Sequence, residues 1–412
     1  MVLAVLVTAL APVAGAQAAL GDWAQFGYGA AHNGYQRYET AIGRSTVANL
    51  RSRWVIPCRL CIAPSAVVNG RLFAGSRVNH PPTAPVNPTG RLSAWNARTG
   101  VLLWRRPLDR PAYLSAPAVV NGIAYVTTQD WSFSGDGTGG SLYAFDASTG
   151  ALLWRRQVHA RTSPAVIDGM VFIAGGASST TDTTVWAFGA RHGALRWKAT
   201  QPGTFYLLDH VAPTVARGRV FLGLPGGSVV AFDELTGALV WRAALPSSSG
   251  EEAPLAVGNG LVVASENGIG LYARDAATGG LRWSYTPAGA NAEIQPVAPA
   301  IANGVVFLLY NGLWHDGGSG DRAAALRLAD GLPIWDRELP QRGTQTRGAP
   351  TVANGVVYVP DFPGIDALRT SDGRVLRTFS VAPGDAYGSA IISNGSLYTV
   401  ELNAGIRRFA LP

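Results

Sequence analysis

Eight copies of one short pattern run through the 412-residue sequence and constrain its fold more than any other feature. Each copy begins with an apolar run that ends in a turn sequence, most often Asn-Gly, as in Val119 to Tyr125 and Val352 to Tyr358. A second part, Ala-x-Asp/Asn-x-x-Thr-Gly-x-x-x-Trp, follows in three copies, as in Ala144 to Trp154, and looser forms of it end at Trp197, Trp283 and Trp335. A repeat at a spacing of about 45 residues is typical of the blades of a propeller.

Each repeat supplies four strands, which we call A to D from the centre of the ring outward. The Asn-Gly pair suits a two-residue hairpin between strands A and B, and Asp-x-x-Thr-Gly suits a longer turn between C and D. The last repeat reaches the end of the chain without a D strand, whereas Leu50 to Val55 resembles a D strand with no blade of its own. We therefore predict an all-β, eight-bladed propeller over residues 50–412, closed by the N-terminal strand completing the last blade.

The repeated tryptophans are expected to dock between blades and not to line a cofactor site. They are Trp54, Trp104, Trp154, Trp197, Trp241, Trp283 and Trp335.

The first 49 residues precede the ring. Residues 1–18 are apolar and end in Ala16-Gln17-Ala18, which is typical of a signal peptide. Residues 19–49 are aromatic and glycine-rich, and we expect them to cap the ring by packing along its outside or underneath it. No segment is long and apolar enough to span a membrane. We expect a secreted, periplasmic or cell-envelope protein that is a soluble monomer after cleavage.

Cysteine and charge content narrow the function classes. Cys58 and Cys61 are the only cysteines, and in an exported protein such a pair is expected to form a disulfide. The alternative is a redox-active pair. The net charge of +7 comes with no nucleic-acid motif, so we expect no nucleic-acid partner.

The B–C and D–A connections vary in length and emerge on one face, which is the natural binding surface. Aligning the repeats places two rings of positions there. The first ring, three residues before the proline of strand A or its equivalent, contains Cys61, Leu114, Arg161, His210, Glu251, Pro296, Arg347 and Tyr387. The second, six residues after the A–B turn glycine, contains Ser76, Thr128, Gly175, Leu224, Glu266, Tyr310, Asp361 and Glu401.

Two interpretations of these rings remain open. In one, Glu266, Asp361 and Glu401 bind a hard cation, and His210 or Asp209 acts as a base. The candidate ligand-binding residues are then Arg161, Glu251, Arg347 and Tyr387, together with Trp131 and Trp314 in two long loops. In the other, these charges pair with one another or with water and keep the mouth of the channel soluble.

The repeat from Ala144 to Trp154 and its siblings resemble the pyrroloquinoline-quinone (PQQ) repeat family, the quinoprotein-like propellers with a tryptophan-docking motif. The opening Asp22 to Gly27, followed by His32-Asn33-Gly34, is similar to the start of many exported members. The resemblance covers nearly the whole chain after residue 18 and implies the propeller fold. It implies two functional classes, the PQQ-dependent alcohol dehydrogenases and the propeller of the outer-membrane β-barrel assembly machinery, which is a non-enzymatic scaffold.

The sequence departs from both classes. The dehydrogenases use a disulfide between adjacent cysteines, and this chain has none; the scaffold is lipid-anchored, and no cysteine stands near the predicted cleavage site. Because no complete catalytic set is present, we favour a binding or scaffold module that presents its variable face to a protein, peptide or glycan. A PQQ- or metal-dependent oxidoreductase is the alternative. PQQ with calcium or a lanthanide stays open as a cofactor without a complete ligand set.

Overall fold

The structure is a computed structural model of the whole chain. Its described residues are 19–58, 66–77, 90–108, 113–129, 140–159, 162–176, 182–203, 212–224, 226–246, 254–266, 269–288, 293–294, 297–313, 319–340, 348–361, 364–380, 388–401 and 405–412.

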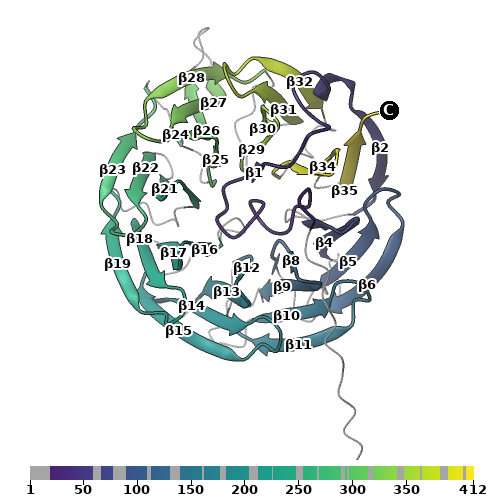
Figure 1. Cartoon of the computed structure of the whole chain (residues 1–412), viewed down its shortest axis with the longest axis vertical. Helices are drawn as coiled ribbons and strands as arrows, with labels where there is room; N and C mark the ends of the chain where they lie inside the picture. Colours follow the sequence, from purple (N-terminus) through teal and green to yellow (C-terminus); the bar gives the residue numbers. More distant parts are fainter. Residues whose placement is uncertain are drawn as a thin grey trace, which may run out of the picture.

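Eight antiparallel sheets stand around a central axis like the blades of a propeller, as Figure 1 shows. Within each blade neighbouring strands are joined in a simple up-and-down order, with the first strand innermost. This confirms the predicted all-β, eight-bladed architecture. No helix in the described part of the chain is long and apolar enough to cross a membrane.

The strands of blades one to four are β3 (Ala66–Val68), β4 (Arg71–Arg77), β5 (Gly90–Asn96) and β6 (Leu102–Leu108); β7 (Tyr113–Leu114), β8 (Ala118–Val120), β9 (Ile123–Gln129), β10 (Gly140–Asp146) and β11 (Leu152–Gln157); β12 (Ala165–Ile167), β13 (Met170–Gly175), β14 (Asp182–Gly189) and β15 (Leu195–Pro202); and β16 (Thr214–Ala216), β17 (Arg219–Leu224), β18 (Ser228–Asp233) and β19 (Leu239–Ala244).

The strands of blades five to eight are β20 (Leu255–Gly258), β21 (Leu261–Glu266), β22 (Gly270–Asp275) and β23 (Leu281–Tyr285); β24 (Glu293–Ile294), β25 (Ala300–Ala302), β26 (Val305–Leu313), β27 (Ser319–Arg327) and β28 (Pro333–Glu338); β29 (Thr351–Ala353), β30 (Val356–Asp361), β31 (Gly364–Arg369) and β32 (Val375–Ser380); and β33 (Ile391–Ser393), β34 (Ser396–Glu401) and β35 (Gly405–Ala410).

The ring is closed by a strand from the other end of the chain. β2 (Arg51–Ile56) pairs antiparallel with β35 as the outermost strand of blade eight, so both ends of the ring meet in one sheet. This confirms the predicted closure. It leaves no blade without its fourth strand, which is what a closed ring needs to bury all its blade faces.

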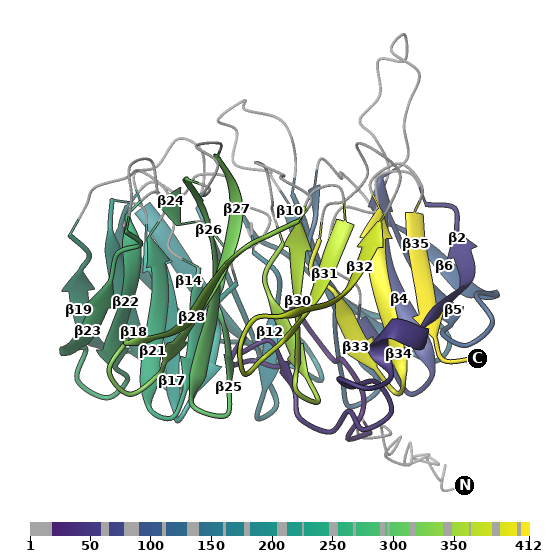
Figure 2. The same ribbon diagram turned by 90° about the horizontal axis from the view of Figure 1, so that it is seen from above.

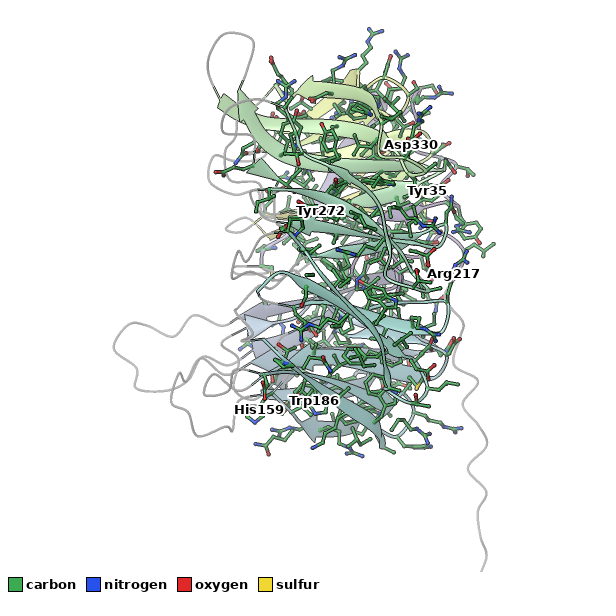
Figure 3. The ribbon with its side chains drawn as sticks, turned by 90° about the vertical axis from the view of Figure 1, so that its left-hand side faces the viewer. Tyr35, His159, Trp186, Arg217, Tyr272 and Asp330 are labelled. Carbon is green, nitrogen blue, oxygen red and sulfur yellow. The ribbon has the colours of Figure 1, made fainter. Side chains whose placement is uncertain are left out.

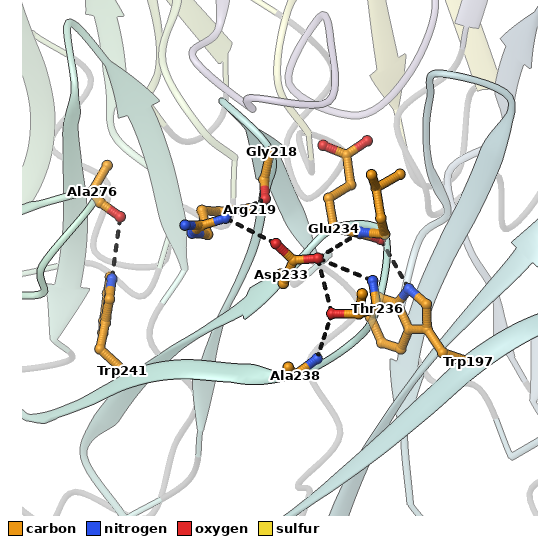
Figure 4. Close-up of polar contacts among 10 residues, drawn as sticks. Trp197, Gly218, Arg219, Asp233, Glu234, Thr236, Ala238, Trp241 and Ala276 are labelled. Carbon is orange, nitrogen blue, oxygen red and sulfur yellow. Dashed lines mark hydrogen bonds and ion pairs between the residues drawn. The ribbon is translucent and has the colours of Figure 1, made fainter.

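A tryptophan joins one blade to the next at seven of the eight interfaces. The indole N–H of Trp197 in blade three donates to the backbone oxygen of Glu234 in blade four, 2.9 Å away, and Trp241 donates to Ala276 in the same way (Figure 4). The glycine of each C–D turn is needed because it lies flat under this ring: a Cβ on Gly237 would be 2.6 Å from Trp197. The equivalent bonds are made by Trp54, Trp104, Trp154, Trp283 and Trp335.

The interface between blades seven and eight uses arginine instead. Arg377 stands at the tryptophan position, and its guanidinium lies over the ring of Phe379, 4.4 Å from the ring centre. Its Nη1 donates to the backbone oxygens of Ala48 and Leu50 at 2.8 and 2.6 Å, at the end of the 3-10 helix η1 (Val47–Asn49). The chain just before β2 therefore takes the place of the missing C–D turn of blade eight.

The segment that precedes the ring winds across its centre and then reaches the rim, where η1 lies against β32, the outermost strand of blade seven (Figure 1). Residues 23–36 contact the same position, the first apolar residue of the repeat, in all eight A strands. Backbone groups of Trp23, Ala24, Ala30, Ala31, Asn33 and Gly34 bond Val67, Val119, Val215, Val257, Ile301 and Val352. Between Gly34 and Gln36, β1 (Tyr35–Gln36) runs parallel to β29.

Two glutamine side chains complete this series. The amide of Gln25 accepts from Val166 N–H at 2.8 Å and donates to Val166 C=O at 3.1 Å, so it imitates a strand in blade three. Gln36 donates to Ile392 C=O in blade eight at 3.4 Å. A space of only about 10 Å³ remains between this segment and blades six to eight. That is about the least volume that holds one water molecule.

Candidate functional site

The two faces of the ring differ. Figure 2 shows the N-terminal segment at the face that carries the A–B and C–D turns, which we call the turn side; the opposite face, where B strands end and C strands begin, is the loop side. In Figure 3 His159 lies toward the loop side, whereas Tyr35 and Arg217 lie toward the turn side. The second ring of predicted positions, at the ends of the B strands, is therefore on the loop side.

Much of the predicted site lies outside the described residues. This holds for Cys61, Arg161, Asp209, His210, Glu251, Arg347, Tyr387, Trp131 and Trp314. Cys58 is described and is disulfide-bonded, and Cys61 is the only other cysteine in the sequence. The positions that the structure does place are those of the second ring.

In blades five to eight the second ring is polar and buried. Glu266 and Tyr310 are each 2% exposed, and Asp361 and Glu401 are not exposed at all. A buried charge or polar group is costly unless a partner satisfies it. In each blade the partner comes from the neighbouring C strand of the same sheet.

Glu401 forms an ion pair with Arg407. The arginine Nε lies 2.6 Å from one carboxylate oxygen and its Nη2 lies 3.1 Å from the other, so the contact is bidentate. Arg407 reaches outward and is partly exposed, whereas the carboxylate is enclosed. A carboxylate held by two charge-assisted hydrogen bonds is well compensated where it stands.

Asp361 is hydrogen-bonded to a second acid, Asp366, which is also fully buried. Burial, followed by the hydrogen bond to Asp361, raises the pKa of Asp366, and a hydrogen bond that the Thr378 hydroxyl donates opposes this, so that the pKa is raised to about 8. At neutral pH one proton is therefore shared by this pair, with Asp366 as the donor. Two carboxyl groups in contact cannot both ionise without strong repulsion.

Glu266 accepts a hydrogen bond from the Tyr272 hydroxyl, which occupies the same C-strand position as Asp366 and Arg407. Burial raises the pKa of Tyr272, and the nearby carboxylate raises it further, so the hydroxyl keeps its proton and donates. The same pair of positions thus holds a carboxylate–tyrosine, an acid–acid and a carboxylate–arginine contact in blades five, seven and eight.

In blade six the second-ring residue Tyr310 belongs to a network of four side chains, of which the alignment of repeats had placed only Tyr310. Arg322 donates to Tyr310 Oη at 3.0 Å and to Glu338 Oε1 at 3.0 Å, and it pairs with Asp336 Oδ1 at 3.0 Å. The Tyr310 hydroxyl in turn donates to Asp336. Burial and the Asp336 carboxylate raise the pKa of Tyr310. Strand register could have predicted this network, because Tyr310, Arg322 and Glu338 stand directly opposite one another in three adjacent strands.

These contacts test whether the predicted acids fit a metal centre. Glu266, Asp361 and Glu401 belong to three different blades, and each is engaged by a C-strand side chain of its own blade. Among the described residues no three His, Cys, Asp or Glu side chains form a group able to hold a metal ion. The described donor set does not fit a metal site, because a hard cation needs several converging oxygens.

A family model described as outer membrane protein assembly factor BamB matches residues 88–252 and 183–410. These overlapping matches run over most of the chain. The chain belongs to this BamB family.

Individual relatives are distant. The BamB protein of Bordetella pertussis is 26% identical over 268 residues, which are 58% of this chain and 62% of that protein. Tetrathionate hydrolase of Acidithiobacillus ferrooxidans is 26% identical over 305 residues, which are 72% of this chain and 55% of that protein. The chain thus spans roughly 55 to 62% of the length of the BamB relatives it matches.

Solved structures share the fold. A europium-containing methanol dehydrogenase superposes with a TM-score of 0.71 at 15% identity, covering 95% of this chain and 98% of that one. BamB from Moraxella catarrhalis superposes with a TM-score of 0.62 at 16% identity, covering 88% of this chain and 99% of that one. An enzyme and an assembly factor are thus both similar to this chain, so the fold alone does not choose between them.

Proposed function

We propose that this BamB-family propeller is a non-catalytic scaffold that binds a protein partner, or a peptide segment of one, with its loop side. The observation that carries the proposal is the pairing of the buried polar residues on that side. In blades five to eight each of these side chains is hydrogen-bonded or ion-paired inside its own sheet, and none of these contacts depends on a bound substrate. A reaction centre needs instead side chains that converge on one substrate.

The arrangement on the turn side also favours the loop side as the binding face. The N-terminal segment lies there across the centre of the ring and bonds all eight A strands. The loop side is the one on which connections of different length and composition emerge, and such loops on a rigid scaffold are the usual carriers of binding function. In the same proposal the chain is exported to the cell envelope, loses residues 1–18 and acts as a monomer. A glycan is the second class of partner for this face.

A quinone-dependent oxidoreductase is the second candidate. It is favoured by a stretch that is 31% identical over 130 residues to the dehydrogenase subunit of the quinone alcohol dehydrogenase of Gluconobacter oxydans. That stretch is 29% of this chain and 17% of that protein. The engaged carboxylates described above weigh against it.

The scaffold proposal is tested by photo-crosslinking in cells. A photoreactive phenylalanine derivative replaces Asp182 or Glu293, two exposed loop-side residues, or Ala277 or Asn303, two exposed turn-side residues in blades five and six. We expect discrete crosslinked proteins from the loop-side positions and none from the turn-side pair. Crosslinks from the turn side alone, or none from the loop side, would overturn the choice of face.

A further inference from the structure

A groove of about 500 Å³ lies on the turn side over blades one and two and reaches the C–D turn of blade three. Phe73 and Val119 form its floor but are buried in the core, and its exposed apolar surface comes from Ile123 and from Leu153, which is 47% exposed. Arg71 lines one wall, and Arg191 and His192 line the outer end. The groove therefore combines apolar surface with cationic side chains, away from the loop side.

Arg71 differs from its counterpart in blade four in what it faces. Both arginines begin a B strand, and each stands opposite the last residue of the C strand. In blade four that residue is Asp233, whose Oδ2 lies 3.1 Å from Arg219 (Figure 4). In blade one it is Asn96, whose side-chain oxygen accepts instead from the backbone N–H groups of Arg98 and Thr99.

The consequence is an arginine without an acid. No carboxylate of a described residue pairs with Arg71, whereas Arg219 pairs with Asp233 through Nη1. The buried Nε atoms of both arginines lack an acceptor, so the two blades differ in the acid at the Nη end. A half-buried guanidinium that lacks an acceptor is costly, and a carboxylate is the group whose geometry matches it best. Three other charged C-strand ends on this side form ion pairs within their own blades, namely Asp275–Arg282, Arg327–Asp330 and Arg369–Asp372.

The acid that does line the groove is Asp146, and it is already engaged. Its Oδ1 accepts from the backbone and hydroxyl groups of Ser148 and Thr149, at 2.6 to 2.9 Å. Burial raises its pKa, but these hydrogen bonds outweigh burial and hold the pKa below the usual range. With Arg71 and Arg191 against this one carboxylate, the groove carries a net positive charge.

We propose that this groove binds an extended protein segment in which a carboxylate stands beside aliphatic side chains. Arg71 and Arg191 hold the carboxylate, and the aliphatic side chains cover Ile123 and Leu153, which are the apolar lining side chains that remain partly exposed. The site is distinct from the loop-side surface of the proposed function, because it lies on the opposite face. Its occupant supplies the acid that blade one lacks.

The probes are fluorescein-labelled hexapeptides of alternating Leu and Glu, or of alternating Leu and Gln, and the measurement is fluorescence anisotropy with the purified full chain. The decisive variant is Asn96→Asp, which gives Arg71 the partner that Arg219 already has. Arg71→Met removes the charge and keeps the length of the side chain. Arg217→Met, at an exposed turn-side arginine in blade four, is the matched control.

We expect the glutamate peptide to bind at least about tenfold more tightly than the glutamine peptide, because charge-assisted hydrogen bonds are the stronger ones. Asn96→Asp and Arg71→Met should each weaken its binding about tenfold, and Arg217→Met should leave it unchanged. Equal affinity for the two peptides, no binding of either, or unchanged binding by Asn96→Asp would overturn the proposal. Asn96→Asp adds a surface ion pair, so a folded variant is expected, and its unfolding midpoint is checked alongside.

Discussion

Asp361 and Asp366 are hydrogen-bonded to each other in adjacent strands of blade seven, and neither carboxyl group is exposed to solvent. In blades five and eight the same two positions hold a carboxylate with a tyrosine or an arginine. Blade seven is thus the one of these three in which the contact depends on a shared proton. Its stability should respond to pH in the range where that proton is lost.

The raised pKa of Asp366 determines whether the free energy of unfolding rises or falls with pH. Between about pH 4, the usual pKa of an aspartate, and about pH 8 the folded protein keeps a proton that the unfolded chain releases. The free energy of unfolding therefore falls as pH rises through this window, by at most about 1.4 kcal/mol per pH unit. The contribution of the neutral carboxyl is fully present below about pH 4 and is lost by the time pH exceeds 8.

Asp366→Asn should flatten this dependence, because the amide donates to Asp361 at every pH. We expect urea unfolding at pH 5.5 and pH 8.5 to show a smaller difference in the variant than in the wild type. Asp330→Asn, at an exposed turn, is the control and should behave as the wild type over this range. An equal pH difference in the wild type and in Asp366→Asn would show that the pair does not share a proton.

Gln25 belongs to the segment that precedes the ring, yet we expect its side chain to contribute strongly to the stability of blade three. Its side chain makes both hydrogen bonds of Val166 in the innermost strand of blade three, and it is 5% exposed. Gln25→Ala leaves a buried N–H and a buried C=O without partners and should lower the free energy of unfolding by about 2 to 4 kcal/mol.

Urea denaturation followed by tryptophan fluorescence measures this loss. Arg37→Ala, at an exposed position of the same segment, should stay within about 0.5 kcal/mol of the wild type. If Gln25→Ala is as stable as Arg37→Ala, the segment does not hold blade three.

For Arg377, the repeat pattern and the structure predict opposite effects of a substitution on the stability of the protein. A change to the tryptophan found at this position in other blades would be expected from the pattern alone to stabilise the ring. The structure predicts the reverse, because the oxygens of Ala48 and Leu50 would lose their charged donor and an indole has a single N–H.

We expect Arg377→Trp to lower the free energy of unfolding by about 2 kcal/mol and Arg377→Lys to lower it less. Thermal and urea unfolding of the three proteins at one pH measure the order. A stabilised Arg377→Trp would mean that the blade seven to eight interface tolerates the ordinary tryptophan docking.

The repeat pattern was enough to predict the blades and the closing strand, because Asn-Gly hairpins and Trp-bearing strands mark their own places in the chain. It was not enough for contacts that replace the pattern. Arg377 departs from the repeat, and only its contact with η1 shows why an arginine serves there. The path of residues 23–36 was not predictable either, since one backbone group per blade leaves no side-chain signature.

For the candidate site, too, the repeat pattern predicted the positions of some residues but not their contacts. The alignment of repeats brought Glu266, Asp361 and Glu401 to one level of the ring, which the structure bears out as B-strand ends. Their partners Tyr272, Asp366 and Arg407 lie on the next strand, and hairpin register would have found them. Arg161, His210, Glu251, Arg347 and Tyr387 fall outside the described residues, so their roles stay predictions.

We propose that this BamB-family propeller works by binding a partner and not by quinone chemistry. Thermal unfolding of the protein without residues 1–18, titrated with PQQ in the presence of calcium or lanthanum, tests it most directly. A ligand that binds the folded state raises the melting temperature by mass action. We predict no saturable rise up to ligand concentrations well above micromolar. A saturable rise that requires the metal would contradict the claim and establish a cofactor site.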